Sequence, residues 1–342
     1  MKFGVFDHLD DAGTALDRLY ENRLCLVEAY DRARLYAYHL AEHHSTPLGM
    51  AASPGIFLAA VAQRTKRLLF GPLVYLLPFY HPIRLIEEIC MLDQLSGGRL
   101  QLGVGRGVSP VEAAFYGIDV SHSQQMYHEA FQLLMKGLAC DELTFEGKYY
   151  RFKNVPMLLK PAQRPHPPLW YGLGTPESAA WPAANDVNVV MLGLRTTIRA
   201  IVERYRGERA RLGKNPNDTP LLGVSMHVVV ADTDAEALRI ARRAYPLWLR
   251  SFRWLWDKHG LPLRVSNIYP PTWDELQGLD NGVAGSPRTV RDFIAAEIEA
   301  TGINYFVSWL AFGDLSVEES LRSVELFGRE VMPAFGARAA AE

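Results

Sequence analysis

Short apolar runs alternate with helix-length amphipathic segments along this whole chain, and this alternation restricts the possible folds most strongly. It is typical of strand and helix units arranged around a parallel sheet. The apolar runs predicted as strands are 2–6, 36–40, 68–76, 100–104, 169–173, 188–192, 223–230 and 305–309. Eight strands, each followed by a helix, close into one barrel, whereas a doubly wound sheet usually has about five or six strands. The sequence therefore predicts an α/β fold, a single (β/α)8 TIM barrel in one domain over residues 1–342.

Two stretches are longer than this repeat requires. In the first, residues 142–168, polar and apolar residues alternate around a turn at Glu146-Gly147, which predicts a hairpin before the fifth strand. The second, residues 252–286, is rich in tryptophan, proline and glycine and is predicted as a long loop before the eighth strand. Two interpretations of this loop stay open: a lid over a binding site, or ordinary packing.

Charge and cysteine content exclude several classes of partner. The 36 basic and 38 acidic side chains give a net charge of -2 without a long run of either sign, so neither nucleic acid nor a charged membrane is expected. The cysteines, Cys25, Cys90 and Cys140, lack the spacing of a zinc site or a disulfide framework, which favours a reducing cytoplasm. No apolar run reaches the roughly 20 residues of a membrane span, and the first residues read as a strand. We expect a cytoplasmic protein.

The second predicted strand ends in Glu42-His43-His44. In a barrel of parallel strands, catalytic residues lie at the carboxyl ends of the strands. An imidazole titrates near neutral pH, so one histidine that points inward is suited to general acid–base catalysis. A metal site is the weaker interpretation, because adjacent residues of an extended chain point to opposite faces. We therefore predict no metal.

Two neighbouring strands end in sequences suited to an anion. The fourth leads into a glycine-rich turn around Arg106, whose guanidinium can hold a phosphate. The fifth leads into residues 172–178, where Gly174, Thr175 and Ser178 precede a helix whose first amides can bind an anion. An ordinary turn and an ordinary helix cap explain each sequence alone. Together they predict a cofactor or substrate that carries a phosphate.

Short motifs also follow one another in a characteristic order: Met1-Lys2-Phe3-Gly4, Glu42-His43-His44, His81-Pro82, Leu92-Asp93-Gln94-Leu95-Ser96-Gly97-Gly98-Arg99, Gly103 to Gly107, Gly285-Ser286-Pro287, Ala300-Thr301-Gly302-Ile303 and Val331-Met332-Pro333. Each motif is short, but their order and spacing resemble the bacterial luciferase-like flavin monooxygenase family from end to end, and the luciferase alpha subunit in particular.

The resemblance implies a barrel that binds reduced FMN, supplied by a separate NAD(P)H-dependent flavin reductase, and uses O2 to oxygenate a small, apolar organic substrate. Family members usually dimerise, so a homodimer is expected. His43 matches the essential first histidine of luciferase, which implies proton exchange with the oxygen adduct. The flavin contacts implied by the resemblance are Leu73, Val74, Arg106, Gly174, Thr175 and Ser178. In luciferase-like proteins a non-proline cis peptide is common at the position of Leu73-Val74.

The remaining candidate residues would face the substrate. These are Asp7 and His8 after the first strand, Tyr75 on the third, and Trp248, which matches a luciferase tryptophan near the flavin. A capped turn explains the first pair equally well, and packing explains the tryptophan. Gly105 occupies the position of luciferase's reactive cysteine, so the resemblance does not extend to light emission.

Three alternatives stay open. A deazaflavin-dependent oxidoreductase would belong to the same family, although such relatives often carry one histidine where this chain has His43-His44. A non-catalytic partner subunit, like luciferase's second chain, would keep the barrel and lose the site. A metal-dependent barrel hydrolase would need converging ligands, of which Asp7, His8 and His43 are the obvious set.

Overall fold

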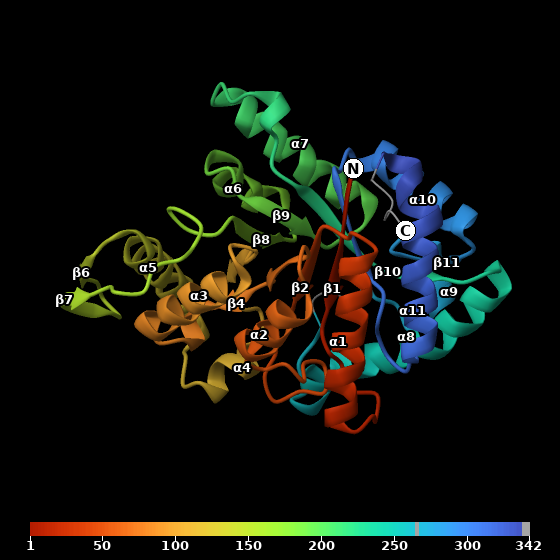
Figure 1. Cartoon of the computed structure of the whole chain (residues 1–342), viewed down its shortest axis with the longest axis horizontal. Helices are drawn as coiled ribbons and strands as arrows, with labels where there is room; N and C mark the ends of the chain where they lie inside the picture. Colours follow the sequence, from red (N-terminus) through yellow and green to blue (C-terminus); the bar gives the residue numbers. More distant parts are fainter. Residues whose placement is uncertain (264–266, 337–342) are drawn as a thin grey trace.

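Parallel strands form a ring whose outer surface is covered by helices (Figure 1). The structure is a computed structural model that describes residues 1–263 and 267–336. Going around the ring, the strands are β1 (Lys2–Asp7), β2 (Ala37–Leu40), β3 (Leu69–Pro72), β5 (Leu102–Gly105), β8 (Leu169–Leu173), β9 (Asn188–Met191), β10 (Leu222–Val230) and β12 (Tyr305–Trp309). β1 pairs with both β2 and β12. The predicted TIM-barrel fold is confirmed.

The ring closes between β3 and β5. Phe70 and Leu100 form a parallel bridge, and Gln101 N donates to Phe70 O at 2.8 Å. After β3 the chain continues through a cis peptide at Leu73-Val74 into β4 (Tyr75–Leu76), which also pairs with β5. The cis peptide therefore lies at the carboxyl end of the barrel, at the position that the family resemblance implied.

Several of the helices begin at a proline or end at a glycine. Within the described residues they are α1 (Leu16–Arg32), α2 (Pro54–Arg64), α3 (Pro82–Ser96), α4 (Pro110–Phe115), α5 (Val120–Ala139), α6 (Ala180–Ala184), α7 (Arg195–Arg211), α8 (Asp234–Lys258), α9 (Trp273–Gly278), α10 (Pro287–Thr301) and α11 (Val317–Leu326). Proline, whose missing N–H costs nothing in the first turn, starts α2, α3, α4 and α10. Gly97 and Gly302 end α3 and α10 in the left-handed conformation. None of the helices in the described residues is long and apolar enough to cross a membrane.

The predicted hairpin is confirmed, whereas the predicted long loop is partly wrong. β6 (Glu142–Glu146) and β7 (Arg151–Pro156) pair antiparallel, as expected. In the second insertion, α8 extends to Lys258, α9 follows, and β11 (Gly282–Gly285) pairs with the second half of β10. Thr272 and Glu275 form the capping box that starts α9. Residues 264–266, which belong to the loop interpreted as a lid, lie outside the described residues.

Large side chains fill the middle of the barrel. Tyr305, His39 and Trp170 are fully buried, and His39 Nε2 lies 2.8 Å from Tyr305 Oη. The glycines make room for Tyr305: a Cβ atom on Gly4 would overlap its hydroxyl, and one on Gly223 would lie 2.8 Å from its ring. The interior is therefore a packed core, and functional side chains must gather at the ends of the strands.

Candidate active site

Side chains from three elements meet at the carboxyl ends of β1 and β2. The ring of His8, just after β1, lies 5.5 Å from the ring of His43, just after β2. On its other side, His8 is 6.1 Å from Trp248 of α8, whose Nε1 donates a long hydrogen bond of 3.5 Å to His8 Nδ1. The structure thus brings together three of the residues that the sequence singled out.

Burial decides the charge of His8. The side chain is almost fully buried, and burial, followed by the neighbouring His43, His227 and Arg23, lowers the pKa of His8 well below its ordinary value. His8 is therefore neutral at physiological pH. A neutral imidazole that accepts the Trp248 N–H can offer its other nitrogen as a hydrogen-bond donor.

The two consecutive histidines point in different directions, as expected for an extended chain. His44 is buried and both of its ring nitrogens are used: Nε2 lies 2.8 Å from Glu42 Oε1, and Nδ1 lies 2.7 Å from Tyr116 Oη. The side chain of His43 is 23% exposed, and its Nδ1 lies 3.4 Å from Glu112. No hydrogen bond to its Nε2 occurs in the described part of the chain. His43 is therefore the histidine available to a reacting molecule.

Glu112 of α4 connects the two histidines, and sequence reasoning missed it. Its Oε1 accepts the backbone N–H of His44 at 2.7 Å and faces His43 Nδ1. Burial acts to raise the pKa of Glu112, but the hydrogen bonds and charges of His43 and His44 outweigh burial, so the pKa is lowered. Glu112 is an ionised, buried acceptor. Its Oε1 can accept a hydrogen bond from His43 Nδ1, which leaves Nε2 as the ring nitrogen free to face a reacting molecule.

Asp7 lies outside this group although it is adjacent to His8 in the sequence. Its carboxylate accepts the backbone N–H of Leu9 at 2.8 Å and the hydroxyl of Tyr38 at 3.0 Å, and it pairs with Arg23 of α1 at 3.3 Å. These contacts lie between the strands and α1, because Asp7 and His8 alternate across the strand.

Tyr75 also points away from the barrel end. Its hydroxyl donates to Glu88 of α3 at 2.8 Å, so the ring lies in the helix layer. The structure thus brings neither Asp7 nor Tyr75 to the histidines.

Arg106 lies at the end of β5, and its guanidinium donates to Ser123 Oγ of α5 at 3.2 Å. Among the described residues it has no carboxylate partner. A narrow cleft beside it is lined by Phe79, Arg106, Gly107, Val108, Ser109, Pro110, Ala113, Val120 and Ser123. Arg106 is therefore a cation without a counter-charge at the carboxyl end of the barrel.

Neighbouring strands offer open space near this end. β8 pairs with β5, and after β8 come Thr175 and Ser178, which are exposed; Ser178 Oγ donates to Thr175 O at 2.6 Å. A Cβ atom on Gly172 or Gly174 would meet no other atom within 4 Å. At Gly105, in contrast, a Cβ atom would overlap Val74 Cγ2, so the missing side chain lets the backbone after the cis peptide approach β5.

His227 is a second residue that sequence reasoning missed. It lies in β10 among Trp309 (ring centroids 4.1 Å apart), Trp248 (4.3 Å) and Phe312 (4.7 Å). It is fully buried, and burial lowers its pKa well below the ordinary value. Neither ring nitrogen has a hydrogen-bond partner among residues 1–263 and 267–336. Nothing in the sequence indicated that His227 has a function, because a single histidine within an apolar strand is usually interpreted as a residue of the core.

Comparison with known proteins assigns the family. The family model described as luciferase-like monooxygenase matches residues 1–305 of this chain. The chain belongs to the luciferase-like monooxygenase family. The chain is 41% identical over 336 residues to protein y4wF of Sinorhizobium fredii, with 98% of each chain covered. It is 27% identical to the oxygenase component of the flavin-dependent trigonelline monooxygenase of Acinetobacter baylyi, with 98% of this chain and 96% of that protein covered.

Several solved structures have the same fold as this chain. Monooxygenase RslO1 from Streptomyces bottropensis superposes with a TM-score of 0.86 at 27% identity, covering 98% of this chain and 100% of that one. The oxygenating constituent of 3,6-diketocamphane monooxygenase from Pseudomonas putida, in complex with FMN, superposes with a TM-score of 0.82 at 24% sequence identity. The match covers 97% of this chain and 98% of that one. An F420-dependent secondary alcohol dehydrogenase shares the fold at 18% sequence identity, with a TM-score of 0.72. The match covers 97% of this chain and 98% of that one. The fold alone is therefore compatible with FMN and with a deazaflavin.

Proposed function

We propose that this chain is the oxygenase of a two-component system: it takes reduced FMN from a separate NAD(P)H-dependent flavin reductase and uses O2 to oxygenate a small, apolar organic substrate. The observation that carries the proposal is the accessible imidazole of His43, held by the buried carboxylate of Glu112 and facing His8 at the carboxyl end of the barrel. The relative from Acinetobacter baylyi, itself an oxygenase component, supports the two-component part.

The residues at the strand ends fit a flavin with a phosphate. Arg106 supplies a cation without a counter-charge, and Thr175 and Ser178 supply exposed hydroxyls after the adjacent strand. The free space beside Gly172 and Gly174 would accept a flat group, and the Leu73-Val74 peptide follows β3 at the same end of the barrel. When bound, reduced flavin would supply the electrons that activate O2.

The chain's own side chains would then handle the proton and the apolar substrate. Glu112 keeps the proton of His43 on Nδ1, so Nε2 is the atom that takes a proton from the reacting group and returns it. His44 acts differently: its hydrogen bonds with Glu42 and Tyr116 fix the loop that carries His43. The aromatic side chains of Trp248 and Trp309, next to His8, favour an apolar substrate and exclude water.

Further parts of the proposal rest on the resemblance and on composition. A homodimer and a cytoplasmic location are expected, the latter because Cys25, Cys90 and Cys140 are free thiols. In residues 1–263 and 267–336, no group of three or more His, Cys, Asp or Glu side chains is arranged to hold a metal ion.

The test is an anaerobic titration of the purified chain with reduced FMN and, in parallel, with a reduced deazaflavin coenzyme. Each complex is then mixed rapidly with O2 while the absorbance is followed. We expect tight binding of reduced FMN, binding about tenfold weaker for Arg106→Ala because a charge-assisted hydrogen bond is lost, and an unchanged affinity but altered oxygen reaction for His43→Ala. His122→Ala, which removes an exposed histidine of α5, is the matched control.

The outcomes separate the alternatives. Binding of the deazaflavin alone, with no reaction with O2, would make the chain a hydride-transfer relative. Binding of neither coenzyme would favour a non-catalytic partner subunit. If His43→Ala and His122→Ala behaved alike with O2, the assignment of the proton to His43 would be wrong.

A further inference from the structure

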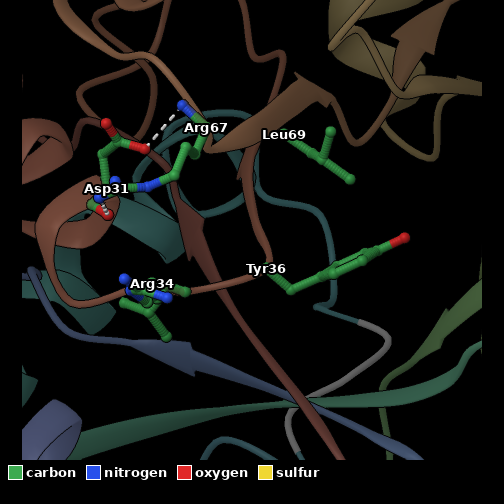
Figure 2. A pocket seen from close by; sticks show the side chains of 6 residues that line it. Asp31, Arg34, Tyr36, Arg67 and Leu69 are labelled. Carbon is green, nitrogen blue, oxygen red and sulfur yellow. Dashed lines mark hydrogen bonds between the residues drawn. The ribbon is translucent and has the colours of Figure 1, made fainter. Parts of the chain in front are cut away.

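A pocket of about 360 Å3 opens at the amino-terminal ends of β2 and β3, at the opposite end of the barrel from the histidines. It is lined by Asp31, Arg34, Leu35, Tyr36, Arg67 and Leu69. Figure 2 shows Arg34 and Arg67 on one side, whereas the side chains of Tyr36 and Leu69 extend together in another direction. The pocket therefore has a basic side and an apolar side.

The basic side has a net positive charge because two guanidinium groups outnumber the one carboxylate, Asp31. Asp31 accepts the backbone N–H groups of Lys66, Arg67 and Leu68 at 3.0, 3.0 and 2.7 Å. Burial acts to raise the pKa of Asp31, but these three bonds outweigh it and lower the pKa. The guanidinium of Arg67 donates to the backbone oxygen of Asp31 at 3.2 Å. In the described residues, neither Arg34 nor Arg67 forms an ion pair.

The backbone of Arg34 is unusual for an arginine. It follows the end of α1 with φ of +61°, in the left-handed region where glycine or asparagine is the ordinary residue. Position 34 thus carries a long side chain although its left-handed backbone conformation disfavours any side chain. The guanidinium of Arg34 is exposed at the mouth of the pocket.

The apolar side is formed by Leu35, which is buried, and by Tyr36 and Leu69, which are partly exposed. Tyr36 is fixed from two directions: its ring packs edge-on against Tyr305 at 5.8 Å, and the ammonium of Lys2 lies 5.1 Å from its ring centroid. Burial raises the pKa of Tyr36, so its hydroxyl stays protonated and can donate a hydrogen bond. A flat, apolar ligand would have a rigid surface to lie on.

We propose that this pocket binds a small aromatic carboxylate, with the carboxylate on Arg34 and Arg67 and the ring against Tyr36 and Leu69. The forked guanidinium matches the geometry of a carboxylate, and two such groups line the same pocket as the apolar side chains of Tyr36 and Leu69. Neither a bare anion nor an uncharged aromatic molecule would use both sides. The site is separate from the candidate active site, so the inference does not depend on the proposed function.

The test is isothermal titration calorimetry on the full chain without flavin, with benzoate as the probe. Inorganic phosphate carries the charge without the ring, and benzyl alcohol carries the ring without the charge. We expect benzoate to bind with a stoichiometry of one, and each of the other two at least about tenfold more weakly. Arg34→Gly, which also relaxes the backbone at that position, and Arg67→Gln should each weaken benzoate about tenfold.

Lys66→Gln is the matched control, because Lys66 lies on the same loop and carries the same charge but does not line the pocket. It should change the affinity less than about twofold. The proposal is overturned if no binding of benzoate is detected at about 10 mM, a concentration that would reveal even a very weak site. It is also overturned if both arginine variants bind benzoate with the same affinity as Lys66→Gln. Equal affinity for phosphate and benzoate would also refute it, because the apolar side would then contribute nothing. Arg106→Ala should leave benzoate binding unchanged, which separates this site from the flavin site.

Discussion

Replacement of the buried His227 by phenylalanine should make the protein less sensitive to acid. The imidazole is fully buried among Trp248, Trp309 and Phe312, and its low pKa keeps it neutral in the folded chain. In the unfolded chain the same group takes up a proton at about pH 6.5. Below that pH the unfolded state binds more protons than the folded state, so the free energy of unfolding falls as the pH falls.

The expected size follows from this one proton. At pH 5.5, one unit below the unfolded pKa, protonation of His227 favours the unfolded state by about 1.4 kcal/mol, and at pH 7.5 by less than about 0.1 kcal/mol. The advantage of His227→Phe over the wild type should therefore grow by about 1.4 kcal/mol between pH 7.5 and pH 5.5. Any steric cost of the larger ring is independent of pH and cancels in this difference.

Urea unfolding followed by tryptophan fluorescence at the two pH values gives all four free energies. Other groups also respond to pH, for example Asp10, whose pKa burial raises to about 7, and groups that do not interact with His227 respond alike in both proteins. His8 does interact with His227, but burial is the largest cause of its lowered pKa and is present in both proteins. His122→Phe controls for the loss of an exposed histidine and should keep the pH dependence of the wild type. The reasoning would be refuted if the difference in the free energy of unfolding between His227→Phe and the wild type were the same at both pH values. His227 would then take up its proton in the folded chain as readily as in the unfolded chain.

Two glycine substitutions test the space inside and at the end of the barrel. Gly174→Ala should leave the free energy of unfolding within about 0.5 kcal/mol of the wild type, because its Cβ atom meets nothing within 4 Å. In the anaerobic titration it should weaken reduced FMN about tenfold; an unchanged affinity would place the flavin elsewhere. Gly4→Ala should lower the free energy of unfolding by at least about 2 kcal/mol, because its Cβ atom would overlap the buried Tyr305 hydroxyl. Urea unfolding checks this, and a loss below about 0.5 kcal/mol would show that Tyr305 can move aside.

The strands of the barrel were predictable because each is a predominantly apolar run. All nine residues of β10 are buried, as is typical of parallel strands covered on both faces. β11 escaped prediction because Gly282-Val283-Ala284-Gly285 is too short and too rich in glycine to read as a strand, and it is held by pairing with β10. A strand that depends on its pairing partner in this way becomes visible only in the folded chain.

The site was predictable in part. The strand ends indicated His8, His43 and Arg106, because parallel strands bring their carboxyl ends to one edge. Glu112 could not be assigned, since it is 68 residues from His44 in the sequence and reads as a helix residue after a proline. Alternation along β1 explains why Asp7 faces Arg23 although its neighbour His8 faces the site. Tyr75 follows the cis peptide, which the periodicity of a regular strand does not describe.

The packing of Tyr305, His39 and Trp170 across the barrel has a consequence for traffic through the molecule. The three rings leave no tunnel along the barrel axis, so a solute at the arginine pocket cannot diffuse through the barrel to the histidines and must travel through bulk water. Tyr36 in the pocket also packs edge-on against Tyr305, so the wall of the pocket is in contact with the rings that fill the barrel. The packed interior therefore separates the two ends of the barrel for any diffusing solute.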